Sequence, residues 1–237
     1  MARFSPARQH RQAKLAAKAQ AEAAPGGEIT GSQYQLMLAQ LAEHRRALKH
    51  LQSVERKIEA KRTFLPVYDA WVKGALENGN GAQDLVLTTV LIWHIDVGNF
   101  DIALDIAAYA VQHALELPDQ YERTLGTALI DEFGDAALRG KMSKTEAVGL
   151  LTRVMRLTND LDAPDQARAK LYKAMGYALI GKVGSTDTDL SKVPPTDAKD
   201  ALQLLQRALD LNEQVGVKKD IERLDRHLKK VSESEAP

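Results

Sequence analysis

Clustered carboxylates are the first residues of this 237-residue chain whose types and spacing could support chemistry. Two groups stand out, namely Asp96, Asp101 and Asp105, and further on Asp131, Glu132 and Asp135. Two or three acids that converge on a divalent ion, often beside a lysine, form the site of a metal-dependent nuclease. Asp101 and Asp105 share a helical face, but a solvent-exposed helix places its acids in the same way. No known nuclease pattern accompanies them, so we expect no catalytic residue and no metal ion.

A glycine-rich stretch, residues 78–84, runs directly into an apolar segment, as phosphate-binding loops do. A Walker loop needs Gly-x4-Gly-Lys and then Ser or Thr, because the lysine reaches the phosphates and the hydroxyl holds magnesium. Here the last glycine, Gly81, leads instead to Asp84, whose carboxylate would repel phosphate. We expect a turn in which Asp84 stabilises the start of the next helix. Residues 176–183 are a second near match, but Val183 replaces the hydroxyl residue.

Histidine and cysteine offer no further site. The six histidines are scattered, at positions 10, 44, 50, 94, 113 and 227, and there is no cysteine. His94 and Asp96 are two residues apart and therefore point to different faces of a helix. The lack of cysteine excludes disulfides, thiolate zinc sites and cysteine nucleophiles, and it fits a reducing compartment. We therefore predict no cofactor.

The composition indicates which elements carry these residues. Alanine and leucine are abundant while aromatic residues make up only 5% of the chain, a balance that favours helices over sheets. The sequence thus predicts an all-α protein. No apolar run has the length of a signal peptide or a membrane span, so we expect no membrane association and a cytoplasmic location.

Charge is distributed unevenly along the chain. The formal net charge is zero, yet residues 1–62 carry a net charge of +7 and residues 63–237 a net charge of −7. A basic segment of this kind favours a polyanion such as nucleic acid, and the alternative is a solvated tail that binds nothing specific. The predicted contacts to DNA are Arg3, Arg8, Arg11, Lys14, Lys18, Arg45, Arg46, Lys49, Arg56, Lys57, Lys61 and Arg62.

The basic region divides into two parts at a cluster of helix breakers, Ala24-Pro-Gly-Gly-Glu-Ile-Thr-Gly-Ser32. Residues 1–30 are predicted to be a mobile basic arm, and residues 31–62 a long amphipathic helix. Its apolar stripe, interrupted by His44 and Glu55, consists of Tyr34, Met37, Leu41, Leu48, Leu51 and Ile58. Such a stripe packs either on a sister helix, which would make a homo-oligomer, or on its own domain.

Residues 63–230 are predicted to form a helical domain, followed by a disordered acidic tail at residues 231–237. Residues 91–118 resemble one helical hairpin of a tetratricopeptide-type repeat, with a Gly-Asn-aromatic turn between two helices. A second, interrupted hairpin is predicted from residues 169–180 and 197–214. Between the hairpins we expect two helices, the second capped by Ser143 with Glu146 at the capping-box spacing.

Several phrases of the sequence, taken in order, resemble a known family. The central block has Trp71, Gly74, Gly79, Gly81, Gln83, Asp84, Trp93, Asp96 and Gly98 in the family's order and spacing, and residues 216–224 are a second marker. On these residues the chain resembles the small terminase subunit of Peduovirus-type tailed phages, a family catalogued as terminase endonuclease subunit. The resemblance covers about residues 34–229.

The resemblance implies a role in viral DNA packaging in the host cytoplasm. A small subunit of this kind assembles as an oligomer, binds double-stranded viral DNA and presents it to a large terminase subunit that holds the ATPase. The family's basic C-terminal extension is replaced here by Ser232-Glu-Ser-Glu-Ala-Pro237, so we expect DNA contact to rest on residues 1–62. Two alternatives are open: an endonuclease that holds magnesium with acids such as Asp96 and Asp101, and a helical-repeat adaptor that binds only proteins.

Overall fold

The computed structural model describes residues 6–118, 121–184 and 186–235. These residues form eleven α-helices and two short 3-10 helices and contain no β-strand, which confirms the predicted all-α class. No helix within these ranges is long and apolar enough to cross a membrane. The chain divides into two compact units, residues 1–125 and 126–237. The predicted helical domain at 63–230 did not anticipate this division, because the helical pattern is alike on both sides.

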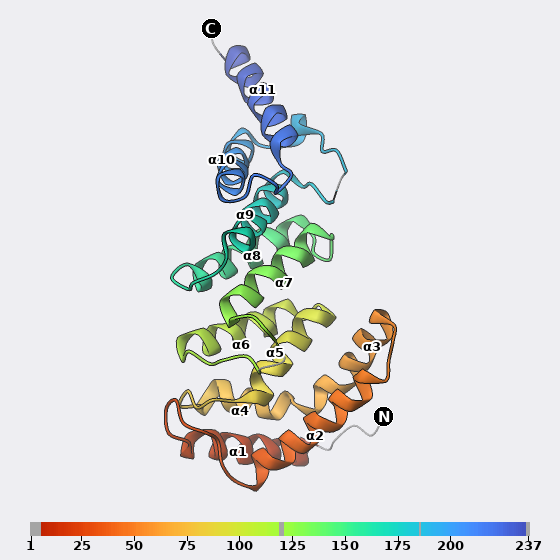
Figure 1. The fold of residues 1–237 in the computed structure, drawn as a ribbon, viewed down its shortest axis with the longest axis vertical. Helices are drawn as coiled ribbons and strands as arrows, with labels where there is room; N and C mark the ends of the chain where they lie inside the picture. The colour runs from red at the N-terminus through yellow and green to blue at the C-terminus, as the bar shows by residue number, and fades with distance from the viewer. Residues whose placement is uncertain (1–5, 119–120, 185, 236–237) are drawn as a thin grey trace. The chain divides into compact units, whose positions relative to one another are not determined.

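Unit 1 is built around one helix that is buried on almost every side. Its elements, red to yellow-green in Figure 1, are α1 (Pro6–Glu22), α2 (Ser32–Lys49), α3 (Val54–Phe64), η1 (Leu65–Val67), α4 (Asp69–Asn78), α5 (Leu85–Val97) and α6 (Phe100–Gln112). Eleven of the thirteen residues of α5 are buried. A helix that is apolar all round belongs in the centre of a core, and α2, α3, η1, α4 and α6 all pack against α5.

The predicted mobile arm is a packed helix in the structure. Helix α1 lies against α4, with Ala16 and Gln20 each only 1% exposed. The two helices approach so closely that a Cβ on Gly74 of α4 would lie 2.7 Å from the backbone nitrogen of Ala17. Alanine and glycine permit this approach because they have almost no side chain. Alanines of the predicted arm thus belong to the packing face of a docked helix.

The single helix predicted at residues 31–62 is divided into two in the structure. Helix α2 ends at Lys49, and α3 begins at Val54. Ser53 caps α3, and its Oγ accepts a hydrogen bond from the backbone N–H of Arg56 at 3.3 Å. Serine is a preferred N-cap residue, so the sequence did carry a signal for the break. The heptad pattern concealed it, since Leu51 and Ile58 keep the apolar spacing across the gap.

Unit 2 contains the remaining helices. They are α7 (Leu125–Leu138), α8 (Lys144–Thr158), α9 (Asp165–Ile180), η2 (Leu190–Lys192), α10 (Pro195–Leu211) and α11 (Lys218–Glu235). The predicted capping box of α8 is confirmed: Ser143 Oγ accepts from the Glu146 N–H, and the Glu146 carboxylate accepts from the Ser143 N–H. Helix α11 continues to Glu235, so the predicted tail is helical as far as the structure describes it.

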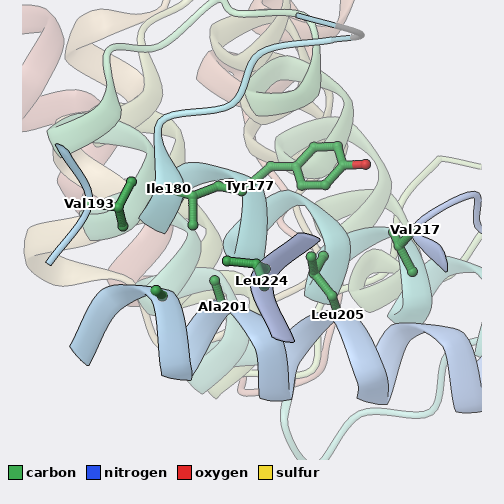
Figure 2. Packing of buried hydrophobic residues seen from close by; sticks show 8 residues of the cluster. Tyr177, Ile180, Val193, Ala201, Leu205, Val217 and Leu224 are labelled. Carbon is green, nitrogen blue, oxygen red and sulfur yellow. The ribbon is translucent and has the colours of Figure 1, made fainter. Parts of the chain in front are cut away.

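The C-terminal core of unit 2 joins α9, α10 and α11. Figure 2 shows Tyr177 and Ile180 of α9 beside Ala201 and Leu205 of α10, with Leu224 of α11 packed against them. Helix α10 lies close to α9 at Gly176, where a Cβ would come within 2.8 Å of Leu205 Cδ2. The helix pairs α5–α6 and α9–α10 pack together as the two hairpin predictions require. The tetratricopeptide-like geometry itself stays a prediction.

Candidate nucleic-acid interface

Asp84 is the last residue of the glycine-rich stretch and is fully buried. One carboxylate oxygen accepts the backbone N–H groups of Val86 and Leu87, at 2.9 and 3.0 Å. The other accepts Gln20 Nε2 at 2.6 Å and Trp71 Nε1 at 2.7 Å. Burial raises the pKa of Asp84, and the four hydrogen bonds oppose that rise. The prediction that Asp84 caps the helix is confirmed, and the same carboxylate ties α1 and α4 to α5.

The two glycines before Asp84 are enclosed by α6. A Cβ on Gly79 would lie 2.1 Å from the Tyr109 hydroxyl, and one on Gly81 would lie 2.3 Å from His113 Nδ1. Gly81 also has a φ of +77°, in the left-handed region that favours glycine, and its N–H donates to the Tyr109 hydroxyl. These glycines therefore serve close packing, and no space is left over them for a phosphate group.

The second near match to a phosphate loop is also explained by packing. Gly176 lies within α9 against α10, and Gly181 ends α9 with a left-handed φ of +67°. A glycine in this conformation is a common C-terminal cap of a helix.

Three of the six carboxylates suggested for a nuclease form ion pairs with lysines. Asp96 of α5 accepts Lys61 Nζ of α3 at 2.5 Å. Lys170 of α9 bridges Asp131 and Asp135 of α7, at 2.8 and 3.2 Å. In the part of the chain that the structure describes, no group of three or more His, Cys, Asp or Glu side chains could hold a metal ion. Asp96, Asp131 and Asp135 thus join helices to each other.

Two histidines are core residues. His44 stacks on Phe64 with ring centroids 3.9 Å apart, and its Nδ1 lies 2.8 Å from the Tyr68 hydroxyl. Burial lowers the pKa of His44 despite the nearby carboxylate of Glu43. Burial also lowers the pKa of His94, to about 4. Both imidazoles are therefore neutral at pH 7. The sequence analysis treated His44 as an interruption of the apolar stripe of residues 34–58, whereas in the structure it belongs to an aromatic cluster.

The predicted oligomerisation stripe is occupied by its own unit. Tyr34, Leu41 and Leu48 are buried, and Tyr34 stacks on Trp71 with ring centroids 5.5 Å apart. The rest of the stripe, Met37, Leu51 and Ile58, is half-buried. Periodicity identified the apolar face of α2 correctly, but it does not distinguish a sister helix from the helix's own domain. The structure assigns this face to the domain.

Four predicted DNA contacts gather where α2 meets α3. Arg46 and Lys49 lie in the last turn of α2, and Arg56 and Lys57 in the first turn of α3. Only residues 50–53 separate the two helices, so the four cations lie on the two sides of one short connection, which Figure 1 shows between α2 and α3. None of the four forms an ion pair within residues 6–118. We call these four residues the cationic corner.

The other predicted contacts fall into different environments. Arg11, Lys14 and Lys18 are exposed on α1, where Lys18 lies 3.7 Å from Glu22. Lys61 is neutralised by Asp96, and Arg62 lies 3.2 Å from Glu59. Arg45 is half-buried. Arg3 and the side chain of Arg8 lie outside the described residues.

Comparison with known proteins assigns the family. The model of the phage small terminase subunit family matches residues 38–166. The chain belongs to this family. The matched segment includes the cationic corner and Asp84, and it leaves out α1, nearly all of α9, and α10 and α11. Small terminase subunits take part in phage DNA packaging, so the family places this chain in that process.

Two relatives support the assignment. The chain is 42% identical to the "Terminase, endonuclease subunit" of Escherichia phage P2 over 227 residues, which cover 95% of this chain and 86% of the relative. It is 24% identical to the "Probable terminase, endonuclease subunit" of Haemophilus phage HP1 over 210 residues, which cover 86% and 73% of the two chains. No solved structure matches this terminase subunit.

Proposed function

We propose that this small terminase subunit binds double-stranded viral DNA through its cationic corner and presents it to the large terminase subunit in the host cytoplasm. The observation that carries the proposal is the cationic corner itself. Arg46, Lys49, Arg56 and Lys57 bring four positive charges to one helix junction, and within the described residues no carboxylate neutralises them. This junction lies inside the segment that defines the family.

The corner offers contacts to phosphates. Flexible lysine and arginine side chains on a helix junction reach the DNA backbone, and such contacts position a protein without reading sequence. The charge is local, because unit 1 as a whole has 14 basic and 14 acidic residues. Arg11, Lys14 and Lys18 extend the basic surface along α1, and we propose Arg3, Arg8, Arg45 and Arg62 as peripheral contacts. Lys61 holds α3 against α5 through Asp96.

Self-association belongs to the same proposal. Four charges release few counterions, so one corner binds DNA weakly at physiological salt. An oligomer places several corners on one duplex, and linked sites bind far more tightly than single ones. Because Tyr34, Leu41 and Leu48 are buried in their own unit, the contacts between copies must use other surfaces.

The test replaces all four corner residues by glutamine. The affinity for duplex DNA should fall strongly, and the slope of log affinity against log salt should decrease by about 3 to 4, since each lost phosphate contact removes roughly 0.9. A matched control changes two arginines and two lysines that are exposed in unit 2, namely Arg156, Lys199, Arg207 and Lys229. An equal effect in both variants would show that net charge alone attracts DNA and would sink the proposal.

The word "endonuclease" in the names of both relatives favours a second activity, DNA cutting. Because the described acids do not converge, we propose that cutting requires the complex with the large subunit. Purified chain with plasmid DNA and Mg²⁺ should therefore leave the plasmid intact. Nicking that Asp101→Asn abolishes would contradict this proposal. Asp96→Asn would break the bridge to Lys61 and is therefore not used.

A further inference from the structure

Unit 2 contains a pocket of about 850 Å³ that the DNA-binding proposal does not use. It lies between the C-terminal half of α9, the segment after α9, the turn between α10 and α11, and the first turns of α11. Five basic residues line it, namely Lys173, Lys182, Lys218, Lys219 and Arg223. Three acids, Asp187, Glu213 and Asp220, line it as well. Unit 2 as a whole is balanced, with 18 basic and 18 acidic residues in 126–237, so the surplus of positive charge in the pocket is local.

Two of the three acids are neutralised within the pocket wall. Asp220 accepts Lys182 Nζ at 2.5 Å and the Tyr177 hydroxyl at 2.6 Å. The side chains of Lys182 and Asp220 are only 9% and 10% exposed, so this pair is part of the structure. Asp187 is paired with Arg223. These pairs leave Lys173, Lys218 and Lys219 against a single acid, Glu213.

The three remaining lysines differ in their surroundings. Lys173 is half-buried and donates to the carbonyl oxygen of Val215 at 2.7 Å, and burial lowers its pKa. Lys218 and Lys219 are exposed and form no ion pair within residues 121–184 and 186–235. Gly216 lies in the same wall with a φ of +76°, in the left-handed region that favours glycine. The pocket thus combines space with positive charge.

The chemistry of the wall selects phosphate over other anions. The one arginine in the pocket, Arg223, is paired with Asp187, so its planar guanidinium group is not available to bind a carboxylate in bidentate fashion. Lysines remain, and as compact point charges they bind phosphate groups. The one aromatic ring, Tyr177, has Lys173 and Lys182 over it, 5.5 and 4.6 Å from its centroid, and is not free to stack on a base. The volume falls within the usual range for small-ligand sites, about 300–1,000 Å³.

We infer that this pocket is a binding site for phosphate groups, with Lys173, Lys218 and Lys219 as the residues that hold them. The phosphates belong either to a DNA strand or to a free nucleotide, and the pocket recognises their shared chemistry without reading a base. The inference is independent of the proposed DNA contact, because the pocket lies in unit 2 and the cationic corner in unit 1.

Calorimetry with inorganic tripolyphosphate at low salt tests the site on the full-length chain. The wild type should bind one tripolyphosphate per chain, and Lys218→Gln with Lys219→Gln should weaken binding by about tenfold or more, because charge-assisted hydrogen bonds are lost. Lys229→Gln with Lys230→Gln is the control, since it removes the same charge from the other end of α11 and lies outside the pocket. Its affinity should stay within about twofold of wild type.

Competition then identifies the source of the phosphate. If a short duplex displaces tripolyphosphate, the pocket holds DNA backbone, and if only ATP does so, it holds a free nucleotide; either result supports the site. Absence of saturable binding by the wild type, or equal losses in the two double variants, would overturn it. The cationic-corner variant should still bind tripolyphosphate, so failure of the DNA-binding proposal would not be mistaken for failure of this one.

Discussion

Each unit contains a buried carboxylate that holds helices together, and the two are stabilised differently. In unit 1, Asp84 is surrounded by neutral donors from α1, α4 and the start of α5. In unit 2, Asp220 accepts from the ammonium group of Lys182 and the hydroxyl of Tyr177. Burial raises the pKa of Asp84. Burial acts on Asp220 in the same direction, but the bonds from Lys182 and Tyr177 outweigh it, and its pKa is lowered.

This difference shows that the hydrogen-bond and charge partners of a buried carboxylate determine the direction of its pKa shift. Neutral donors satisfy the oxygens of Asp84 but do not cancel the cost of burying its charge. A lysine at 2.5 Å supplies the opposite charge to Asp220 and so stabilises the ionised form. The first arrangement acts mainly as a hydrogen-bonding junction, and the second is an ion pair between α11 and the segment after α9.

The largest effect is expected from breaking the junction in unit 1. Asp84→Ala removes the cap of α5 and leaves the buried donors of Gln20 and Trp71 without an acceptor. We expect a loss of about 3 to 7 kcal/mol in the free energy of unfolding, since a cap contributes about 1 kcal/mol and each of the two unsatisfied buried donors costs about 1 to 3. Urea denaturation of the wild type and of Asp84→Ala measures this difference in the free energy of unfolding. The exposed Glu116→Gln change should alter stability by less than about 0.5 kcal/mol, and a similarly small effect of Asp84→Ala would refute the junction.

A smaller effect is expected from breaking the pair in unit 2. Lys182→Met keeps the apolar stem but leaves Asp220 with Tyr177 as its one strong donor. We expect a loss of about 2 to 4 kcal/mol, near the lower end of what removing one partner of a buried pair costs, because Asp220 takes up a proton at the expense of stability. Urea denaturation of Lys182→Met and of the exposed control Lys199→Met gives the two free energies of unfolding to compare. Equal stability of the two variants would mean that the pair contributes nothing.

The smallest effect, and the sharpest contrast, lies in the response to pH. The folded-state pKa of Asp220 is below that of the unfolded chain, so its stabilisation is present above about pH 4 and is lost as the pH falls through the folded value. The folded-state pKa of Asp84 is raised, so its contribution improves as the pH falls toward about 4.

Stability measured between pH 7 and pH 3 separates the two carboxylates. The deficit of Asp220→Asn relative to wild type should shrink on acidification, because the wild-type pair is lost there. The deficit of Asp84→Asn should not shrink, and it should grow through the window in which wild-type Asp84 takes up its proton. Parallel pH profiles for the two variants would remove the distinction between the carboxylates.

Local features of the candidate interface were predictable. The residue types within a few positions were enough to predict that Asp84 caps α5 and that Ser143 and Glu146 form a capping box. They were also enough to interpret the glycines before Asp84 as part of a turn. The basic character of residues 45–62 was also evident. The break between α2 and α3 could also have been predicted from the sequence. Ser53 is an N-cap residue, and its hydroxyl accepts from the N–H of Arg56, only three residues later.

The sequence by itself determined the helices and the distribution of charge, since helical hydrogen bonds and caps join residues three or four positions apart. Only the tertiary structure decided that the arm docks as α1, that the stripe of Tyr34, Leu41 and Leu48 faces its own unit, and which charges are neutralised. Lys61 meets Asp96 across 35 residues, and Lys182 meets Asp220 across 38. Such pairs depend on how helices pack, and periodicity along one helix carries no information about the partner that covers it.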